Sequence, residues 1–183
     1  MFYRRKTYRV KPTRRRLLPP LFQESRQDFL TSTVHVDPKH IVTAAACITN
    51  EQGEVLLVRT QVRPDTWEMP GGQVEVGEPP HLAAIREVCE ETGLQVRLDA
   101  LVGVYFSETR EIANLIFRGG VAGGLLRPAE GEILEAGFFP PDEALTRVTR
   151  PHFRTRLADA LAGYTAAYES FRQPGYQRER LVP

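Results

Sequence analysis

Residues 71–94 read GGQVEVGEPPHLAAIREVCEETGL, with glycine near both ends and two prolines, Pro79 and Pro80, between them. Proline is tolerated in the first turn of a helix and glycine is favoured just after its end. The segment therefore predicts a helix over about residues 80–92 that ends at Gly93. The helical period places four residues on one arc that can pack on a sheet: Leu82, Ile85, Val88 and Cys89.

A separate arc of this helix carries three glutamates, Glu87, Glu90 and Glu91, although like charges three and four residues apart repel one another. A solvated face is the ordinary interpretation of an acidic helix. Such a face usually also holds lysines, whereas here only Arg86 relieves the repulsion, which indicates a cation from outside the chain. Mg²⁺ is held by a few carboxylates together with water and substrate phosphates, and the Gly71-Gly72 turn lets a phosphate or metal approach the backbone.

The fixed residues of this segment have the spacing of a known motif. Gly72, five residues, Glu78, seven residues and then Arg86–Leu94 (REVCEETGL) match every fixed position of the Nudix box, G-x5-E-x7-R-E-U-x-E-E-x-G-U with U aliphatic. The segment therefore resembles the Nudix hydrolase family. The resemblance implies the Nudix fold, an α/β fold in which a mixed central β-sheet lies in an α/β/α sandwich.

The resemblance also implies an activity and a metal site. The activity is hydrolysis of a phosphoanhydride bond in a nucleoside diphosphate linked to another group, with Mg²⁺ or Mn²⁺ as cofactor. Carried over by position, Glu87 and Glu91 would be the main metal ligands, and Glu90 would support them directly or through water. Gly71 or Gly72 would lend a carbonyl oxygen.

Two further roles are an ion pair that holds the loop before the helix and a general base that takes a proton from water. By resemblance, Arg86 and Glu78 would pair and fix the loop against the helix, which is a structural role. Cleaving a diphosphate also needs a general base that activates water. Glu90 or Glu91 could be that base within the box. Three glutamates outside it are alternatives, with Glu132 placed first: Glu130, Glu132 and Glu135.

Two residues just before the box are candidates for substrate binding. Arg59, at the end of a predicted strand, could clamp a phosphate or form a surface ion pair. Trp67 could stack on a nucleobase, although packing of its ring onto the sheet is the favoured alternative. Glu68 could approach the metal, but a loop glutamate is more often solvated.

The rest of the chain predicts strands and helices around the box. Residues 40–60 hold two hydrophobic runs joined by Asn50-Glu51-Gln52-Gly53, which is typical of an antiparallel hairpin. The remaining predicted elements are strands over residues 94–108, 110–122 and 133–140, a helical turn over 141–145 and an amphipathic helix over about 151–170. Strands covered by helices on both sides favour the same α/β/α sandwich.

The charge is unevenly distributed, although the net charge is only +1. Residues 1–16 hold eight basic side chains and no acidic one, so this arm could attract polyphosphate or RNA ends. A solvated extension, or an arm that crosses a dimer partner, is the favoured alternative. We divide the chain into a basic N-terminal extension (1–39), a Nudix hydrolase domain (40–145) and a C-terminal helix and tail (146–183).

Composition is that of an ordinary globular protein, with 42% hydrophobic and 26% charged residues. Cys47 and Cys89 lack metal or disulfide spacing, so we expect buried free thiols and a cytoplasmic location. No stretch reaches the roughly 18 apolar residues of a membrane span.

The expected partners are a small nucleotide-diphosphate substrate and a second copy in a homodimer. Two rival functions remain: an RNA 5′-end pyrophosphohydrolase that uses the basic arm, and a non-catalytic nucleotide-binding sensor.

Overall fold

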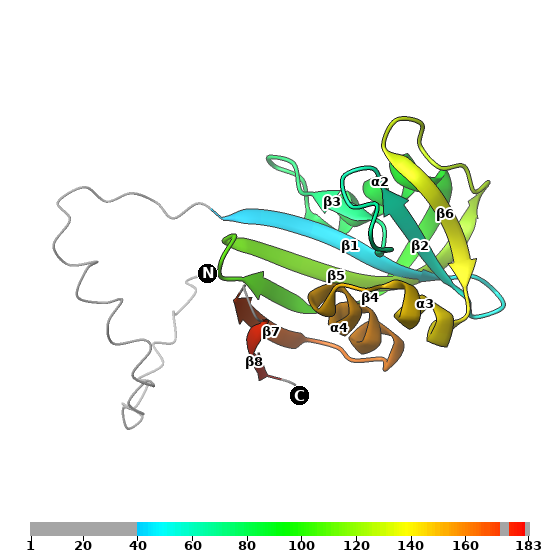
Figure 1. Ribbon diagram of the computed structural model, residues 1–183. Helices are drawn as coiled ribbons and strands as arrows, with labels where there is room; N and C mark the ends of the chain where they lie inside the picture. Colours follow the sequence, from blue (N-terminus) through cyan, green and yellow to red (C-terminus); the bar gives the residue numbers. More distant parts are fainter. Residues whose placement is uncertain (1–39, 173–175, 182–183) are drawn as a thin grey trace, which may run out of the picture. The chain divides into compact units, whose positions relative to one another are not determined.

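The computed structural model describes residues 40–172 and 176–181, and the predicted N-terminal extension lies outside them. One mixed sheet runs through this part of the chain in the order β6-β2-β1-β5-β4-β7-β8, with β3 beside β1 (Figure 1). The elements are β1 (Ile41–Thr49), β2 (Val55–Thr60), β3 (Gly71–Gln73), α2 (Pro80–Thr92), β4 (Leu94–Ser107), β5 (Ile112–Gly124), β6 (Ile133–Phe139), α3 (Pro141–Arg147), α4 (Pro151–Leu161), β7 (Ala167–Arg172) and β8 (Gln177–Leu181).

The sheet is mixed because β1 pairs in parallel with β5 and β4 pairs in parallel with β7, whereas the other pairings are antiparallel. The predicted hairpin of β1 and β2 is confirmed. The side chain of Asn50 accepts hydrogen bonds from the backbone N–H groups of Gln52 and Glu54, at 3.1 and 2.9 Å, and Gly53 takes a positive φ of 76°. A glycine suits this turn because it adopts that conformation without a steric penalty.

The segment before the helix lies between β1 and β2, where these two strands diverge. Glu68 exchanges backbone hydrogen bonds with Val58 of β2, both at 2.9 Å, and β3 pairs with β1 over Thr43–Ala45. A side chain at Gly71 would overlap Ala45 and the carbonyl oxygen of Ala44, so the close approach requires glycine. The Gly71-Gly72 turn is therefore fixed to the sheet by its backbone.

Two hydrophobic cores lie on opposite faces of the sheet, which confirms the predicted sandwich. Residues of β1 alternate between them: Ala44, Ala46 and Ile48 pack with α2, and Cys47 packs on the α3 and α4 side. Figure 1 shows α2 on one side of the sheet and α3 and α4 on the other. None of the helices in the described residues is long and apolar enough to span a membrane.

Helix α2 has the predicted bounds, and Ile85 and Val88 of the predicted packing arc do pack in the core, but the other two residues of that arc do not. The helix ends at Gly93, which takes a left-handed φ of 72°. Leu82 is 48% exposed and Cys89 is also exposed, so the predicted packing of both, including a buried Cys89 thiol, is wrong. Glu91, expected on the separate acidic arc, is buried instead. The buried residues of α2 are Ala83, Ala84, Val88, Glu91 and Thr92.

Small side chains explain this orientation of α2. Ala83 and Ala84 meet Ala44 and Ala46 of β1 in one core cluster, so the helix lies close to the sheet. Larger residues such as Leu82 are consequently left at the side of the contact. The expectation for the other cysteine is confirmed, since Cys47 is buried and burial raises the pKa of its thiol to about 12.

The predicted C-terminal helix is too long. Helix α4 ends at Leu161, after which Gly163 and Ala166 both take positive φ values, 77° and 59°. The chain then continues as β7, which pairs in parallel with β4 and buries Phe171. Pairing with β4 satisfies the backbone hydrogen-bonding groups of this segment. The hydrophobic residues of the segment recur at helical spacing, so the sequence pattern predicted a helix instead of this strand.

Candidate active site

Two carboxylates of α2 lie against the Gly71-Gly72 turn. An oxygen of Glu91, a residue only 4% exposed, accepts a hydrogen bond from the backbone N–H of Gly71 at 3.0 Å. A side chain at Gly72 would overlap the carboxylate of Glu87, so glycine is what leaves room for it. The turn and the helix, which are separated in the sequence, thus form one acidic site.

Arg86 connects this site to the loop before the helix. Its guanidinium donates to both carboxylate oxygens of Glu78, at 2.9 and 3.0 Å, and to the carbonyl oxygen of Gln73 at 3.1 Å. It also donates to Glu87 and Glu90, each at 2.9 Å. The guanidinium holds the pKa of Glu78 below its usual range. Arg86 therefore orients a loop carboxylate and two helix carboxylates at once.

Burial makes the charge on Glu91 unfavourable. Loss of solvation raises the pKa of Glu91 to about 8; the hydrogen bond from Gly71 opposes the rise, and the nearby carboxylates of Glu87, Glu68 and Glu132 add to it. Burial also raises the pKa of Glu87, although Arg86 opposes that shift. These carboxylates are close enough to repel one another, as expected where a cation is to be bound.

Three glutamates outside the box were proposed as a base. Of these, Glu132 is the one that acts electrostatically on the carboxylates of α2. It contributes to the raised pKa of both Glu87 and Glu91. Its loop is attached to the end of α2 by two backbone hydrogen bonds, from Arg127 to Thr92 at 2.7 Å and from Ala129 to Glu91 at 3.0 Å. All three glutamates are exposed; Glu130 lies in the same loop as Glu132, and Glu135 forms an ion pair on β6.

Glu68 is buried rather than solvated, contrary to what its loop position predicted. It is 8% exposed and accepts hydrogen bonds from Arg63 at 2.7 Å and from Thr60 at 3.3 Å. The reason is that the backbone of this residue pairs with Val58, which draws the loop into the sheet. Glu68 lies near enough to Glu91 to help raise the pKa of that residue, so it belongs to the acidic site.

The two predicted substrate contacts have protein partners. Arg59 pairs with Glu135 on the neighbouring strand β6 and donates to the carbonyl oxygen of Pro64 at 3.3 Å. Trp67 packs edge-on against Phe139, with ring centroids 4.9 Å apart, and Arg147 lies over its indole ring. The Trp67 ring therefore has the sheet contact that was favoured for it.

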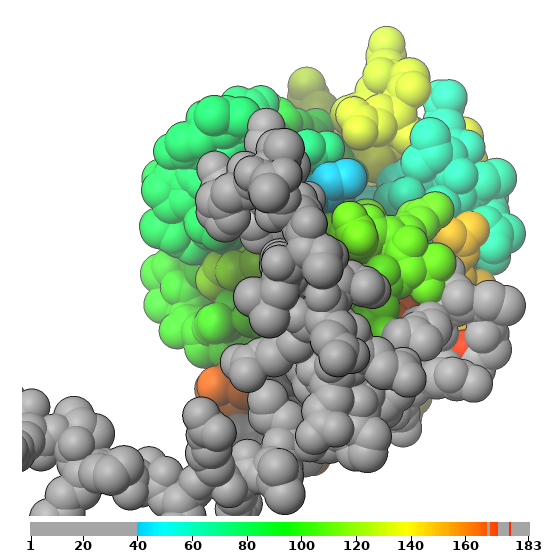
Figure 2. Space-filling model, turned by 90° about the vertical axis from the view of Figure 1, so that its left-hand side faces the viewer, coloured from blue at the N-terminus to red at the C-terminus, as the bar shows by residue number. Residues whose placement is uncertain are grey.

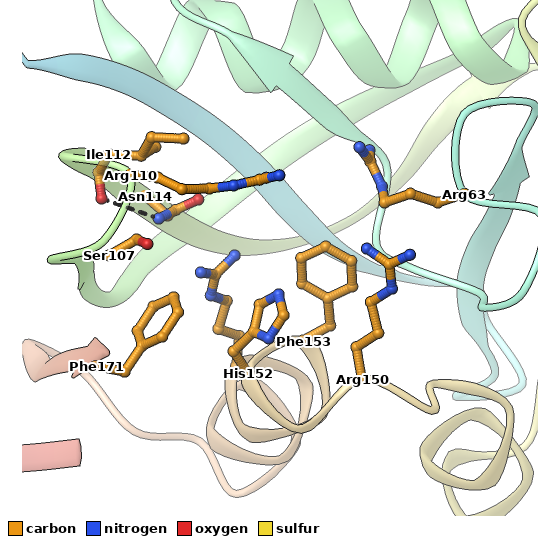
Figure 3. A pocket seen from close by; sticks show the side chains of 10 residues that line it. Arg63, Ser107, Arg110, Ile112, Asn114, Arg150, His152, Phe153 and Phe171 are labelled. Atoms are coloured by element: carbon orange, nitrogen blue, oxygen red, sulfur yellow. Dashed lines mark hydrogen bonds between the residues drawn. The ribbon is translucent and has the colours of Figure 1, made fainter. Parts of the chain in front are cut away.

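A cavity of about 260 Å³ begins at Gly71 and Gly72 and extends to a group of arginines. It adjoins a smaller hollow of about 100 Å³ that shares several of the same residues (Figure 3). Four polar residues that were not predicted as site residues line both: Arg63, Arg110, Asn114 and Arg156. Of these four, only Arg156 could have been singled out from the sequence, because it is a charged residue near Phe153 and Leu157 on the apolar side of a predicted helix.

The donor set fits a hard divalent cation only with help from a ligand. In the described residues, no group of three His, Cys, Asp or Glu side chains is arranged to hold a metal by itself. Glu87 and Glu91 nevertheless flank the Gly71-Gly72 turn at one end of the cavity. Mg²⁺ commonly takes one or two carboxylates together with water and substrate phosphates, so this arrangement suits an ion that binds with its substrate.

A family model described as the NUDIX domain matches residues 39–160. The chain belongs to the Nudix family. It is 40% identical to a MutT-like protein from Streptomyces ambofaciens, over 69% of this chain and 80% of that protein. It is 43% identical to the diphosphoinositol polyphosphate phosphohydrolase 3-alpha of Mus musculus, over 38% of this chain and 44% of that protein.

Solved Nudix structures have the same fold. A NUDIX hydrolase from Nitrosomonas europaea covers 70% of this chain and 93% of its own, with 29% identity and a TM-score of 0.61. A MutT protein from Methanosarcina mazei Go1 covers 70% and 99%, with 26% identity and a TM-score of 0.58. This Nudix protein is accordingly an enzyme, a pyrophosphohydrolase that acts on phosphoanhydride bonds.

Proposed function

We propose that this Nudix hydrolase cleaves a phosphoanhydride bond in a nucleoside diphosphate linked to another group, and that it depends on Mg²⁺ or Mn²⁺. One observation carries the proposal: the carboxylates of Glu87 and Glu91 lie against the Gly71-Gly72 turn, and this turn lines a cavity large enough for a ligand. The diphosphate would lie beside this turn.

Each acidic residue has a distinct part in the proposal. Glu87 and Glu91 hold the divalent ion, Glu90 supports them, and Gly71 lends a carbonyl oxygen. When bound, the ion neutralises charge on the phosphate oxygens. Glu132 takes the proton from the attacking water, with Glu90 and Glu91 as alternatives.

The residues outside this group position it or bind substrate. Arg86 fixes the helix carboxylates and the loop through Glu78. Arg59 and Trp67 stay proposed substrate contacts, and neither of them lines the two cavities. For either to bind substrate, Arg59 would exchange Glu135 for a phosphate, and Trp67 would exchange a ring contact with Phe139 or Arg147 for the nucleobase.

A panel of substrates tests the proposal. Nucleoside diphosphate sugars, dinucleoside polyphosphates, ADP-ribose, NADH and capped RNA are assayed for release of phosphate or nucleotide with Mg²⁺, with Mn²⁺ and with a chelator. We expect metal-dependent turnover of at least one nucleoside diphosphate derivative. Binding of these compounds without turnover would instead support the nucleotide sensor.

The RNA alternative depends on residues 1–16, which lie outside the described residues. It predicts that deleting them lowers activity on 5′-triphosphorylated RNA far more than activity on free nucleotides. Equal effects on both substrates would rule it out. A homodimer and a cytoplasmic location are also proposed, and the molar mass in solution, measured by light scattering, tests the first.

A further inference from the structure

The far end of the cavity is strongly basic. Four arginines line the smaller hollow, and no aspartate or glutamate of the described residues does so: Arg63, Arg110, Arg150 and Arg156. They come from the loop after β2, the turn between β4 and β5, and helix α4 with its N-cap residue Arg150. Figure 3 shows the guanidinium groups of Arg63, Arg110 and Arg150 extending toward one space beside Phe153. Segments that are distant in the sequence thus concentrate positive charge at one place.

Arg156 is the buried member of this group. It is 6% exposed, and its Nε has no hydrogen-bond partner within the described part of the chain. Burial lowers the pKa of Arg156 to about 10, and the carboxylates of Glu169 and Glu68 lie near enough to oppose that shift. A buried donor without an acceptor is costly, so an oxygen atom supplied by a ligand would stabilise this side chain.

Aromatic rings hold the arginines in place. The guanidinium of Arg156 lies 5.5 Å from the ring centroid of Phe153 and 5.7 Å from that of Phe171. Arg63 and Arg150 also lie near Phe153, at 5.8 and 6.0 Å. The ring of Phe153 is thus surrounded by cations rather than left open for a nucleobase.

His152 completes the wall without adding charge at neutral pH. Burial, reinforced by the neighbouring arginines, lowers its pKa to about 4, and its ring stacks on Phe171 at 5.3 Å. Two of the arginines already have carboxylate partners, Arg63 with Glu68 and Arg150 with Asp65. Among the described residues no carboxylate forms an ion pair with Arg110, whereas the carboxylates of Glu169 and Glu68 lie near Arg156.

The larger cavity runs from Glu68 and the Gly71-Gly72 turn to this basic end, since its lining includes them as well as Arg63, Arg110 and Arg156. The carboxylates of Glu87 and Glu91 lie against the same turn. We propose that the arginine group binds a second phosphate group of the substrate, remote from the anhydride that is cleaved. This inference rests on the proposed function and narrows its substrate class to nucleoside diphosphate derivatives that carry an additional phosphomonoester.

Arg110 is the residue through which to test this. It lies in the exposed turn between β4 and β5, which Figure 2 shows beside the start of β1. Its replacement by glutamine removes charge without disturbing a core contact. Arg97→Gln is the matched control, because Arg97 is exposed on β4, pairs with Asp99 and does not line the cavity.

Binding is measured first, by calorimetry in the presence of a chelator, with inositol hexakisphosphate as a ligand that has several phosphates and no anhydride. We expect Arg110→Gln to weaken binding at least tenfold and Arg97→Gln to leave it unchanged. Equal binding by the two variants would overturn the proposal. The basic residues 1–16 are present in both variants, so they cannot produce the difference.

Turnover is measured next, on NADPH and NADH, which differ by one phosphomonoester. In the unaltered enzyme we expect kcat/KM to be at least tenfold higher for NADPH. Arg110→Gln should remove most of that preference by raising KM for NADPH. An unchanged preference in Arg110→Gln, or none in the unaltered enzyme, contradicts a substrate phosphate at this place.

The two measurements separate the two proposals. Selective binding of inositol hexakisphosphate without hydrolysis of any anhydride would leave the arginine site standing and refute the proposed function. Metal-dependent hydrolysis with no effect of Arg110→Gln on binding or preference would do the reverse. If the arginine group bound a separate regulator instead of the substrate, inositol hexakisphosphate would change kcat. If it competes with the substrate for the cavity, inositol hexakisphosphate raises only the apparent KM.

Discussion

The carboxylate of Glu91 accepts a hydrogen bond from the backbone N–H of Gly71 at 3.0 Å, across twenty residues of sequence. This bond fixes the last turn of α2 to the strand β3. It also holds an acidic group at a place where burial raises its pKa to about 8. The fold thus holds a carboxylate where a cation can bind it. In the metal-free protein, the burial of this charged group lowers the stability of the folded state.

Glu91→Gln should abolish most turnover while the protein stays folded. An amide can still accept the hydrogen bond from Gly71, but it is a weak ligand for a hard cation. Loss of a residue that merely orients a metal ligand costs about 10–100-fold, so loss of a ligand should lower kcat by more than about 100-fold. Circular dichroism and steady-state kinetics on a substrate from the panel check this.

Glu143→Gln is the control for that variant, because Glu143 is exposed on α3 and pairs only with Arg147 among the described residues. It should keep the rate of the unaltered enzyme. If Glu91→Gln retains that rate as well, Glu91 is not a metal ligand.

The stability of the metal-free protein should fall as the pH rises from about 4.5 to about 8. The pKa of Glu91 is raised from 4.5 to about 8, so the folded state binds this proton more tightly than the unfolded state. Its contribution to the free energy of unfolding is complete below 4.5 and is lost above 8. Urea unfolding at pH 5 and pH 8.5 with a chelator should differ by at least about 1 kcal/mol from this group.

Glu91→Gln provides the comparison for the pH effect, since glutamine does not titrate. The variant should show a smaller fall in stability between the two pH values and should be more stable than the unaltered protein at pH 8.5. Added Mg²⁺ with nucleotide should stabilise only the unaltered protein. An identical pH dependence in both proteins would assign the effect to other groups.

The local features of the fold could be predicted from the sequence. The Asn50–Gly53 turn, the limits of α2 and the strands β1, β2, β4, β5 and β6 each follow from short-range patterns of glycine, proline and hydrophobic residues. Only part of the packing face of α2, Ile85 and Val88, could be predicted in this way. The rest depends on Ala44 and Ala46 of β1, which lie far from the helix in the sequence and let Ala83 and Ala84 come close.

Gly72→Ala should impair activity much more than stability. A methyl group at this position overlaps the Glu87 carboxylate, which is the flexible end of a side chain and can move away. The free energy of unfolding then changes by less than about 1 kcal/mol. A shift of about 1 Å at a catalytic site can nevertheless lower the rate about 100-fold. We expect a loss of kcat of at least tenfold, measured beside the free energy of unfolding.

Gly120→Ala is the matched control, because a methyl group there meets only the carbonyl oxygen of Thr49 at an ordinary 3.6 Å. It should alter neither the rate nor the stability by much. Equal losses of activity in the two variants would mean that the space at Gly72 has no special role.

The acidic half of the site could be predicted and the basic half could not. The spacing of the box brings Glu87, Glu90 and Glu91 together within one helix, so a local pattern suffices. Arg63, Arg110 and Arg156 come from a loop, a turn and a second helix, and only the mixed sheet brings them together. The burial of Glu68 likewise depends on its pairing with Val58, which no local pattern indicates.

Metal uptake is the most direct test of the acidic site. Calorimetric titration of Mg²⁺ and Mn²⁺ into the protein, with a non-hydrolysable nucleoside diphosphate analogue present, measures binding without turnover. We predict saturable uptake that weakens at least tenfold in Glu91→Gln and is unchanged in Glu143→Gln. No uptake by the unaltered protein, or equal uptake by Glu91→Gln, would contradict the assignment of these carboxylates to a catalytic metal.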